Sequence, residues 1–383
     1  MRICKLTYIY PNSRYPEWGS FVERHVREWR TMNLDVDVIA PKSFTRTWWF
    51  FLHKKKQLIE IAGNQIKRPV FISLPAFNLW GKRFFTSLTN KCLMDAFLRG
   101  LSMSPVPDLY IGKFLFPGGE AAVKAKFIYK RKAFVDLGES NSLLEMHHED
   151  IIKAKEIFKS LDGFFCVSPR LVNEAIILGA KKEDVVFIPN TVDINRFRPL
   201  NKMECRNKLG LPQQEFIIIF VGHLIERKGP LRVLQALNAL SIPVRGVFLG
   251  RGPQVPMGEK VQYCGSVPNQ DLPMWLNSAN VFVLPTLAEG NCNAINEAMA
   301  CGLPVISSNI VDISPQVPDD AGILIDPNDP VQIASAIEKL YYNKNLLASY
   351  GRNGLEYAQS RNEKSRAMQI IEWIVKRNPE FLF

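Results

Sequence analysis

The chain has 383 residues, 47% of them hydrophobic, and a formal net charge of +11. This apolar share supports packed cores and excludes a disordered chain, and the length suits two domains better than one. Seven scattered cysteines form no disulfide or zinc-binding pattern, which indicates a reduced compartment. The first ten residues do not resemble a signal peptide, and no apolar run is long enough to span a bilayer, so we expect a soluble or surface-associated protein.

The first half opens with a β-α-β pattern. An apolar run over 2–10 predicts a buried strand, 21–30 has helical spacing, and 35–40 predicts the second strand. Gly19 precedes the helix, and we expect Ser20 to be its N-cap, with Glu23 completing a capping box. Alternation along the second strand places Asp35 and Asp37 on one face, where we expect them to face solvent and to bind no metal.

A basic stretch with interleaved aromatic residues follows. From Val38 to Met94 the only acidic residue is Glu60. An anionic membrane surface would suit this pattern, and so would a solvated basic face whose aromatic residues enter the core. Nucleic acid is disfavoured. The stretch contains Lys42, Arg46, Lys54, Lys55, Lys56, Lys67, Arg68, Lys82, Arg83 and Lys91, with aromatic residues at Trp48, Trp49, Phe50, Phe51, Trp80, Phe84 and Phe85.

Strands and helices continue to alternate toward a hinge. Strands are predicted over 105–112, 132–137, 162–168 and 185–188, and the third of these is followed by a helix over 170–179. His147 and His148 have no metal-ligand spacing and are interpreted as ordinary surface residues. We place the hinge between the two halves near 190–200.

The second half starts a new set of parallel strands. The run 216–221 is entirely apolar, the loop 222–229 follows it, and Pro230 begins a helix at a favoured position. Further strands are predicted over 244–249, 261–265 and 281–284. Two halves that alternate strand and helix predict doubly wound α/β domains, with ligand expected in the cleft between them.

The most informative stretch runs from Pro285 to Ile306. It consists of a loop, a short helix from Asn293 that ends at Gly302, and a further strand. Backbone N–H groups at the start of such a helix favour a phosphate. Glu289 lies in the loop and Glu297 in the helix. Two carboxylates there suit the hydroxyls of a ribose and of a sugar on the far side of a diphosphate.

This stretch resembles the signature of the retaining nucleotide-sugar glycosyltransferases of family 4, similar to those that build bacterial surface polysaccharides. The two glutamates, the intervening glycine and the Gly302-x-Pro304 helix end are all in register. The resemblance implies the GT-B fold. It places an N-terminal Rossmann-like acceptor domain at 1–190 and a C-terminal nucleotide-sugar domain at 191–360. A helix at 361–383 would return to the first domain, where Trp373 would anchor it.

The match is incomplete at several positions. Lys228 matches the lysine that the family uses to grip the diphosphate, but His223 stands at the position of the family's arginine. Arg227 either replaces that arginine or is simply solvent-exposed. Leu137 stands where the family often has a histidine near the donor sugar, and Glu139 is either a substitute for it or a surface loop acid. Thr191 replaces a glycine of the interdomain segment.

The resemblance implies transfer of a sugar from a nucleoside diphosphate sugar to an acceptor hydroxyl. It assigns the ribose to Glu297, the donor sugar to Glu289 and the leaving diphosphate to Lys228, so that Glu289 and Lys228 are the catalytic candidates. No cofactor or metal is expected. The donor-binding candidates are Glu297, Gly290, Asn291, Cys292, Asn293, Gly222, His223, Arg227, Val267 and Gly19.

The basic first half would serve a glycan or lipid-linked glycan acceptor, in the cytoplasm or at the inner face of the plasma membrane. A sugar-nucleotide epimerase of the same fold remains an alternative, as does a non-catalytic protein that binds a nucleotide sugar or nucleic acid. An epimerase would consume the donor alone, whereas a non-catalytic protein would show no turnover.

Overall fold

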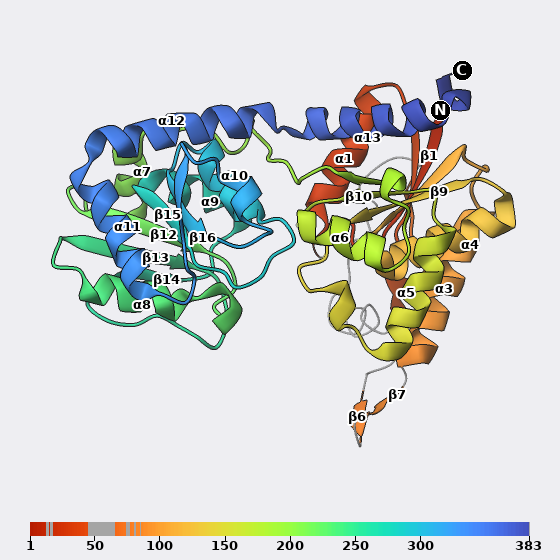
Figure 1. Cartoon of the computed structure of the whole chain (residues 1–383), viewed down its shortest axis with the longest axis horizontal. Coiled ribbons are helices and arrows are strands. Elements are labelled where there is room, and N and C mark those ends of the chain that lie inside the picture. Colours follow the sequence, from red (N-terminus) through yellow and green to blue (C-terminus); the bar gives the residue numbers. More distant parts are fainter. Residues whose placement is uncertain are drawn as a thin grey trace, which may run out of the picture. The chain divides into compact units, whose positions relative to one another are not determined.

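The computed structural model describes residues 1–12, 15, 18–44, 66–73, 77–79, 82–84 and 86–382. The chain forms two compact units, residues 1–188 with 367–383 and residues 189–366. We call them unit 1 and unit 2 (Figure 1). Much of the basic aromatic stretch, including Arg46, Lys54–Lys56 and Trp48–Phe51, lies outside the described residues. None of the described helices combines the length and apolar character needed to cross a bilayer.

Unit 1 is built on a seven-stranded parallel sheet in the order β11-β10-β9-β8-β1-β2-β4. Strand β1 pairs with β2 and β8, so that Ile3 lies opposite both Val36 and Leu109. The sheet strands are β1 (Arg2–Leu6), β2 (Asp35–Ile39), β4 (Ile66–Lys67), β8 (Leu109–Lys113), β9 (Lys132–Leu137), β10 (Gly163–Cys166) and β11 (Val185–Phe187). The short pairs are β3 (Lys42–Ser43) with β5 (Val70–Phe71) and β6 (Phe77–Leu79) with β7 (Lys82–Phe84).

Helices cover both faces of this sheet, which is buried between two hydrophobic clusters. The helices are α1 (Ser20–Thr31), α3 (Thr86–Ser102), α4 (Glu120–Tyr129), α5 (His148–Ser160) and α6 (Pro169–Ile177), and an irregular turn with an extended residue at Phe116 spans Phe114–Gly119. The N-cap of α1 is Gly19 and not Ser20, and it makes no side-chain cap. Gly19 has φ 75°, and a Cβ there would lie 2.6 Å from the Ile9 carbonyl, so close backbone approach determines this helix start.

Asp35 and Asp37 correct a second expectation. Both lie on one face of β2, but Asp37 is buried rather than solvent-facing. Arg2 Nε lies 3.1 Å from Asp35 Oδ2 and 3.2 Å from Asp37 Oδ2. The two carboxylates therefore hold an arginine. Among the described residues, no group of three or more His, Cys, Asp and Glu side chains is arranged to hold a metal ion.

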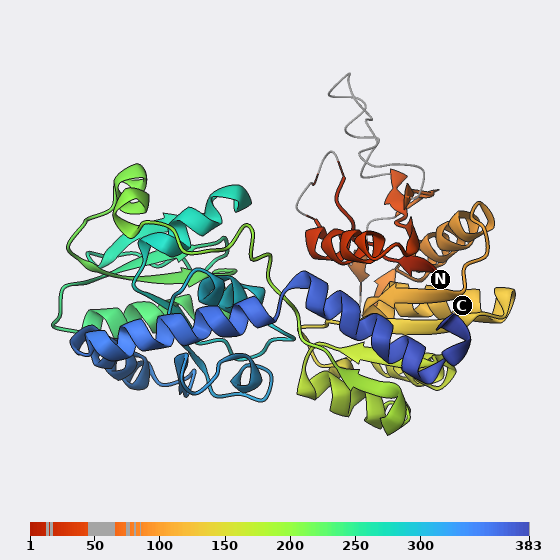
Figure 2. The ribbon, with the colours of Figure 1, turned by 90° about the horizontal axis from the view of Figure 1, so that it is seen from above.

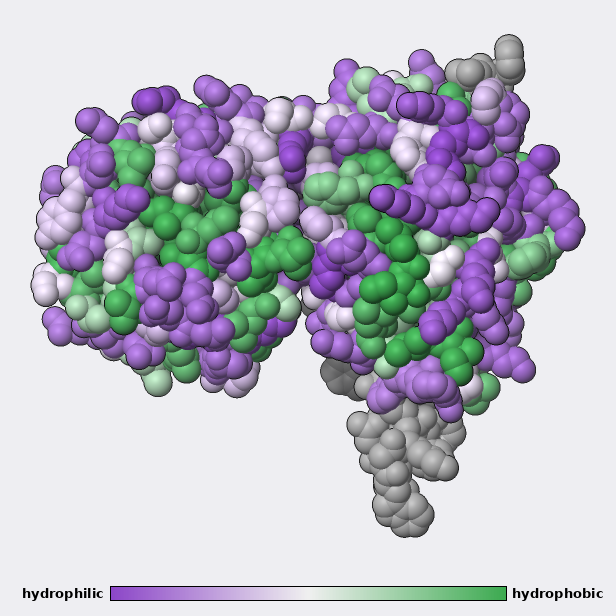
Figure 3. All heavy atoms as spheres, in the orientation of Figure 1, coloured by the Kyte–Doolittle hydropathy of each residue, from purple (hydrophilic) through white to green (hydrophobic). Residues whose placement is uncertain are grey.

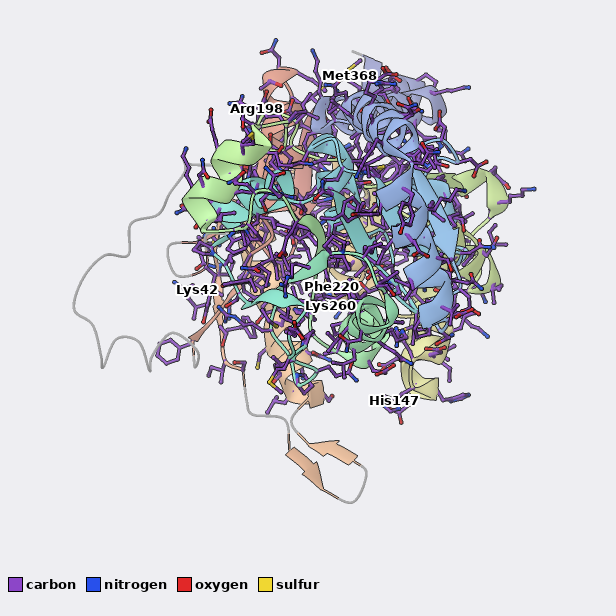
Figure 4. All side chains as sticks on the ribbon, turned by 90° about the vertical axis from the view of Figure 1, so that its left-hand side faces the viewer. Lys42, His147, Arg198, Phe220, Lys260 and Met368 are labelled. Carbon is purple, nitrogen blue, oxygen red and sulfur yellow. The ribbon has the colours of Figure 1, made fainter. Side chains whose placement is uncertain are left out.

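Unit 2 has a six-stranded parallel sheet in the order β14-β13-β12-β15-β16-β17. Its core includes Phe220, which Figure 4 shows within the body of the molecule, while the exposed His147 of unit 1 lies at the periphery. The strands are β12 (Phe216–Val221), β13 (Val244–Leu249), β14 (Val261–Gly265), β15 (Val281–Leu284), β16 (Val305–Ser308) and β17 (Gly322–Ile325). The helices are α7 (Lys202–Leu209), α8 (Pro230–Ala239), α9 (Leu272–Ser278), α10 (Asn293–Ala300), α11 (Pro330–Tyr342) and α12 (Lys344–Ser360).

The last helix, α13 (Glu363–Arg377), begins in unit 2, and its residues from Ala367 belong to unit 1. Figures 1 and 2 show it beside α1, and the Trp29 indole N–H donates to the Ala367 carbonyl at 3.2 Å. Trp373 meets the rings of Phe134 and Phe165 edge-on, with centroids 6.4 and 5.4 Å away. The indole of Trp373 therefore anchors α13 on the sheet of unit 1, as the sequence predicted.

Candidate functional site

The sheet of unit 2 has a switch point between β12 and β15. These neighbouring strands pair through Ile218 and Val281, but the chain leaves β12 toward β13 on one side and leaves β15 toward β16 on the other. The loops that follow the two strands therefore diverge at the carboxyl edge of the sheet. Doubly wound sheets bind ligands at such a point. Both predicted motifs, 222–229 and 285–293, are these two loops.

Hydrogen bonds join the two loops along their length. The Leu287 N–H donates to the Arg227 carbonyl at 2.7 Å, and Arg232 Nη2, from helix α8 directly after the first loop, donates to the Pro285 carbonyl at 3.0 Å. Gly229, with φ 76°, ends the first loop, and a Cβ there would lie 2.8 Å from the Pro285 carbonyl oxygen. A glycine is therefore required where the loops meet.

Lys228 and Glu289 form a buried ion pair at the centre of this junction. The Lys228 ammonium donates to Glu289 Oε1, and their side chains are 11% and 6% exposed. Thr286 Oγ1 donates to the same oxygen at 3.3 Å, and Arg227 Nη1 lies 3.6 Å from it. Arg227 Nη1 also donates to the Ala288 carbonyl. Two cations thus share one carboxylate, which leaves the cluster formally positive.

Burial lowers the pKa of Lys228 below its ordinary value of 10.5, and the Arg227 guanidinium acts in the same direction. The Glu289 carboxylate opposes this effect because contact with an opposite charge favours the protonated amine. A diphosphate entering the junction would meet a partly desolvated ammonium beside a guanidinium. Charges in such surroundings interact more strongly than charges in water.

Helix α10 begins directly after the second loop, with Cys292 as its N-cap. The Cys292 N–H donates to Gln316 Oε1 at 2.9 Å, so that this group is bonded within the protein. Gln316 carries no motif, and the sequence did not indicate it. The predicted phosphate cradle over 290–293 therefore has one of its amides engaged by a side chain from the segment after β16.

Asparagine side chains tie the interdomain segment to α10. Asn190 Nδ2 donates to Asn293 Oδ1 at 3.1 Å, and Asn296 Nδ2 lies 3.4 Å from the Asn190 carbonyl and from Asn291 Oδ1. Asn293 and Glu297 are one helical turn apart on α10, and Glu297 is half-buried. Asn190, in the predicted hinge, therefore contacts the helix that carries Glu297, the predicted ribose-binding residue.

The other predicted site residues are distributed more widely. Gly222 directly follows β12, and a Cβ on Gly250 of the neighbouring loop would lie 1.8 Å from the Gly222 carbonyl oxygen. His223 is exposed, whereas Arg227 is part of the ion-pair cluster. Val267 is partly buried against the core of unit 2. Gly19 belongs to unit 1, whereas the two loops belong to unit 2.

Glu139 of unit 1 lies at the end of β9, two residues after the buried Leu137. Its carboxylate accepts from the Leu115 N–H at 2.7 Å and from the Gly138 N–H at 2.8 Å, which joins the segments that follow β8 and β9. Burial raises the pKa of Glu139, and the two backbone donors and Lys113 oppose that shift. Glu139 is thus an organising residue of this strand end and not a surface acid.

Comparisons with known proteins agree with this geometry. A family model described as "Glycosyl transferases group 1" matches residues 215–343, which contain both loops and α10. The chain carries a group 1 glycosyltransferase domain. The family resemblance drawn from the Glu289–Glu297 stretch is confirmed, and the protein is a glycosyltransferase.

Two curated relatives are matched over different lengths of this chain. A Bacillus subtilis (strain 168) protein named as a teichuronic acid biosynthesis glycosyltransferase, TuaC, is 28% identical over 353 residues, covering 88% of this chain and 89% of that protein. The O-antigen chain mannosyltransferase B of Escherichia coli is 31% identical over 216 residues, covering 50% of this chain and 56% of that protein.

Solved structures establish the fold. The crystal structure of Anabaena HepE in complex with UDP and glucose superimposes with a TM-score of 0.72 and 18% identity, covering 98% of this chain and 100% of HepE. The predicted GT-B fold is therefore confirmed.

Proposed function

We propose that the protein transfers a sugar from a nucleoside diphosphate sugar to a hydroxyl of a bacterial surface-polysaccharide precursor, with retention at the anomeric carbon. The observation that carries this proposal is the buried Lys228–Glu289 pair beside Arg227, at the switch point of unit 2 and directly before α10. TuaC and the mannosyltransferase are named for surface polysaccharides, and HepE is described with UDP and glucose. These names support the substrate class.

Each group at the junction has a role in this reaction. Lys228 and Arg227 stabilise the negative charge that develops on the leaving diphosphate, and Glu289 orients both the ammonium and the sugar hydroxyls. Glu297 accepts hydrogen bonds from the ribose diol. Loss of one such electrostatic donor typically costs roughly 3 kcal/mol of barrier. The side-chain cations and the start of α10 neutralise the diphosphate in this proposal, which requires neither metal nor cofactor.

The acceptor is proposed to be a glycan or a lipid-linked glycan, with unit 1 on the acceptor side. All seven cysteines are free, which supports a reduced compartment, and the basic charge supports peripheral contact with an anionic inner membrane face. No nucleic-acid partner is proposed. A sugar-nucleotide epimerase is not favoured because the relatives described above are named as transferases.

Ligand-induced stabilisation tests the donor assignment. A nucleoside diphosphate at ~100 times its dissociation constant should stabilise the protein by about 2.7 kcal/mol, which a thermal-shift screen of different bases would detect. The Glu297→Ala variant should lose most of that shift because its ribose acceptor is gone. Turnover with the matching sugar donor, and none with donor alone, separates transfer from epimerisation. An undiminished shift in Glu297→Ala would disprove the ribose assignment.

A further inference from the structure

A cavity in unit 1 lies at the opposite edge of the sheet from Glu139. Its volume is about 460 Å³. Lys132 begins β9, Asp162 directly precedes β10, and Asp184 directly precedes β11, and all three residues line the cavity. The cavity is therefore at the amino-terminal edge, whereas ligands of doubly wound sheets bind at the carboxyl edge. This cavity has no role in the proposed donor binding or sugar transfer.

Positive charge dominates the lining of this cavity. Five cationic side chains and two aspartates line it, a formal excess of three positive charges. Both aspartates already have partners: Asp162 Oδ2 lies 2.8 Å from Lys126 Nζ, and Asp184 pairs with Arg377. The excess charge favours an anion of more than one negative charge, such as a phosphate group. The cations are Lys126, Lys132, Lys159, Lys181 and Arg377.

An exposed apolar pair stands directly beside the cavity lining in the sequence. Phe127 and Ile128, on the last turn of α4, are 57% and 56% exposed. Between Ala121 and Val135 the chain has five basic residues and no acidic one. Figure 3 shows mainly hydrophilic surface where Figure 1 places α4 and the end of α13. Binding of a soluble anion alone would not explain why apolar side chains are exposed between lysines.

We propose that this cavity and the apolar pair form a docking site for anionic phospholipid. The headgroup phosphate enters the cavity against Lys159 and Lys181, and Phe127 and Ile128 insert among the lipid headgroups. Charge complementarity and interfacial aromatic insertion together give reversible membrane attachment. The inference rests on the proposed membrane-side acceptor and specifies the surface that meets the bilayer. It differs from the expectation that the stretch 38–94 makes this contact.

Vesicle flotation of the full-length protein tests the site. Vesicles of phosphatidylcholine with and without phosphatidylglycerol are compared for the wild type, a Lys159→Glu/Lys181→Glu variant and a Phe127→Ser/Ile128→Ser variant. A Lys208→Glu/Arg352→Glu variant makes the same charge change on exposed positions of unit 2 and is the matched control. We expect about tenfold or greater loss of affinity for anionic vesicles in the first two variants, and little change in the control.

The outcomes separate this inference from the proposed function. If the wild type binds anionic vesicles and the Lys159→Glu/Lys181→Glu variant binds equally well, the site is wrong and the stretch 38–94 becomes the membrane contact. If the wild type binds no vesicles, the membrane part of the proposed function fails as well. Unchanged vesicle binding by Phe127→Ser/Ile128→Ser, with glycerol phosphate displacing the protein, would indicate a soluble phosphate ligand and overturn the lipid assignment. Donor turnover, measured in parallel, confirms that each variant is folded.

Discussion

The Lys228 ammonium donates to Glu289 Oε1, although the two residues are 61 positions apart in the sequence. Their contact joins the loops that follow β12 and β15. Neither side chain alone would be stable there, because an unpaired buried charge is strongly unfavourable. The pair therefore links two functions. It holds the β12 and β15 loops together, and it keeps a cation where the leaving diphosphate is proposed to lie.

The Glu289→Gln variant should be both less stable and less active. Removal of the carboxylate leaves Lys228 beside Arg227 without a counter-charge, and breaking a buried pair costs about 3–5 kcal/mol. Chemical unfolding followed at neutral pH should show this loss in unit 2. The Lys228→Met/Glu289→Gln double variant should recover part of the stability but not the turnover. Additive effects of the two single substitutions would show that the pair is not coupled.

Arg227, and not His223, should supply the second phosphate-binding cation. Arg227 lies 3.6 Å from the paired carboxylate, whereas His223 is exposed at the start of the same loop. Arg227→Ala should therefore lower kcat/KM by about 100-fold, as expected for loss of one electrostatic donor. His223→Ala serves as the matched control and should change it by less than about tenfold. The reverse order in steady-state kinetics would return the role to the histidine.

Gly252 should be essential for the position of the β12 loop, whereas Gly258 should not. Both have positive φ, 156° and 141°, but a Cβ on Gly252 would lie 2.1 Å from the Leu224 carbonyl oxygen, and a Cβ on Gly258 meets nothing within 4 Å. Gly252→Ala should thus displace the loop that carries Lys228 and weaken nucleoside diphosphate binding by about tenfold or more. Calorimetric titration of both variants measures this. Equal losses would indicate that backbone strain alone, and not close approach, matters at these positions.

The sequence predicted the element order and the positions of the two loops of the candidate site because apolar runs, glycines and the two glutamates are local signals. Lys228 and Glu289 were named as candidates, but their pairing depends on β12 and β15 being neighbours, which spacing along the chain does not reveal. Gln316 was missed for the same reason: it reaches Cys292 from another segment.

Burial was the second property that local sequence patterns predicted poorly. Asp37 alternates with valines as a solvent-side residue would, yet Arg2 from the neighbouring strand stabilises its buried carboxylate. Ser20 has the chemistry of an N-cap, but the approach of Gly19 to the Ile9 carbonyl determines the helix start. In both cases a contact between segments overrides a local preference.

Lys202 should give the protein an alkaline pH dependence of stability. Burial lowers its pKa from 10.5 to about 8, and Arg206 and Lys344 act in the same direction. Between these two values the unfolded chain binds more protons at this position than the folded chain, so the contribution of Lys202 to stability rises with pH across that window. Below pH 8 the full cost of burying the charged amine is present. The Lys202→Met variant removes the titrating group, so its advantage over the wild type should be largest at neutral pH and should shrink toward pH 10. Urea unfolding midpoints of both proteins at several pH values measure this difference, and a pH-independent gap between the two would show that Lys202 titrates normally.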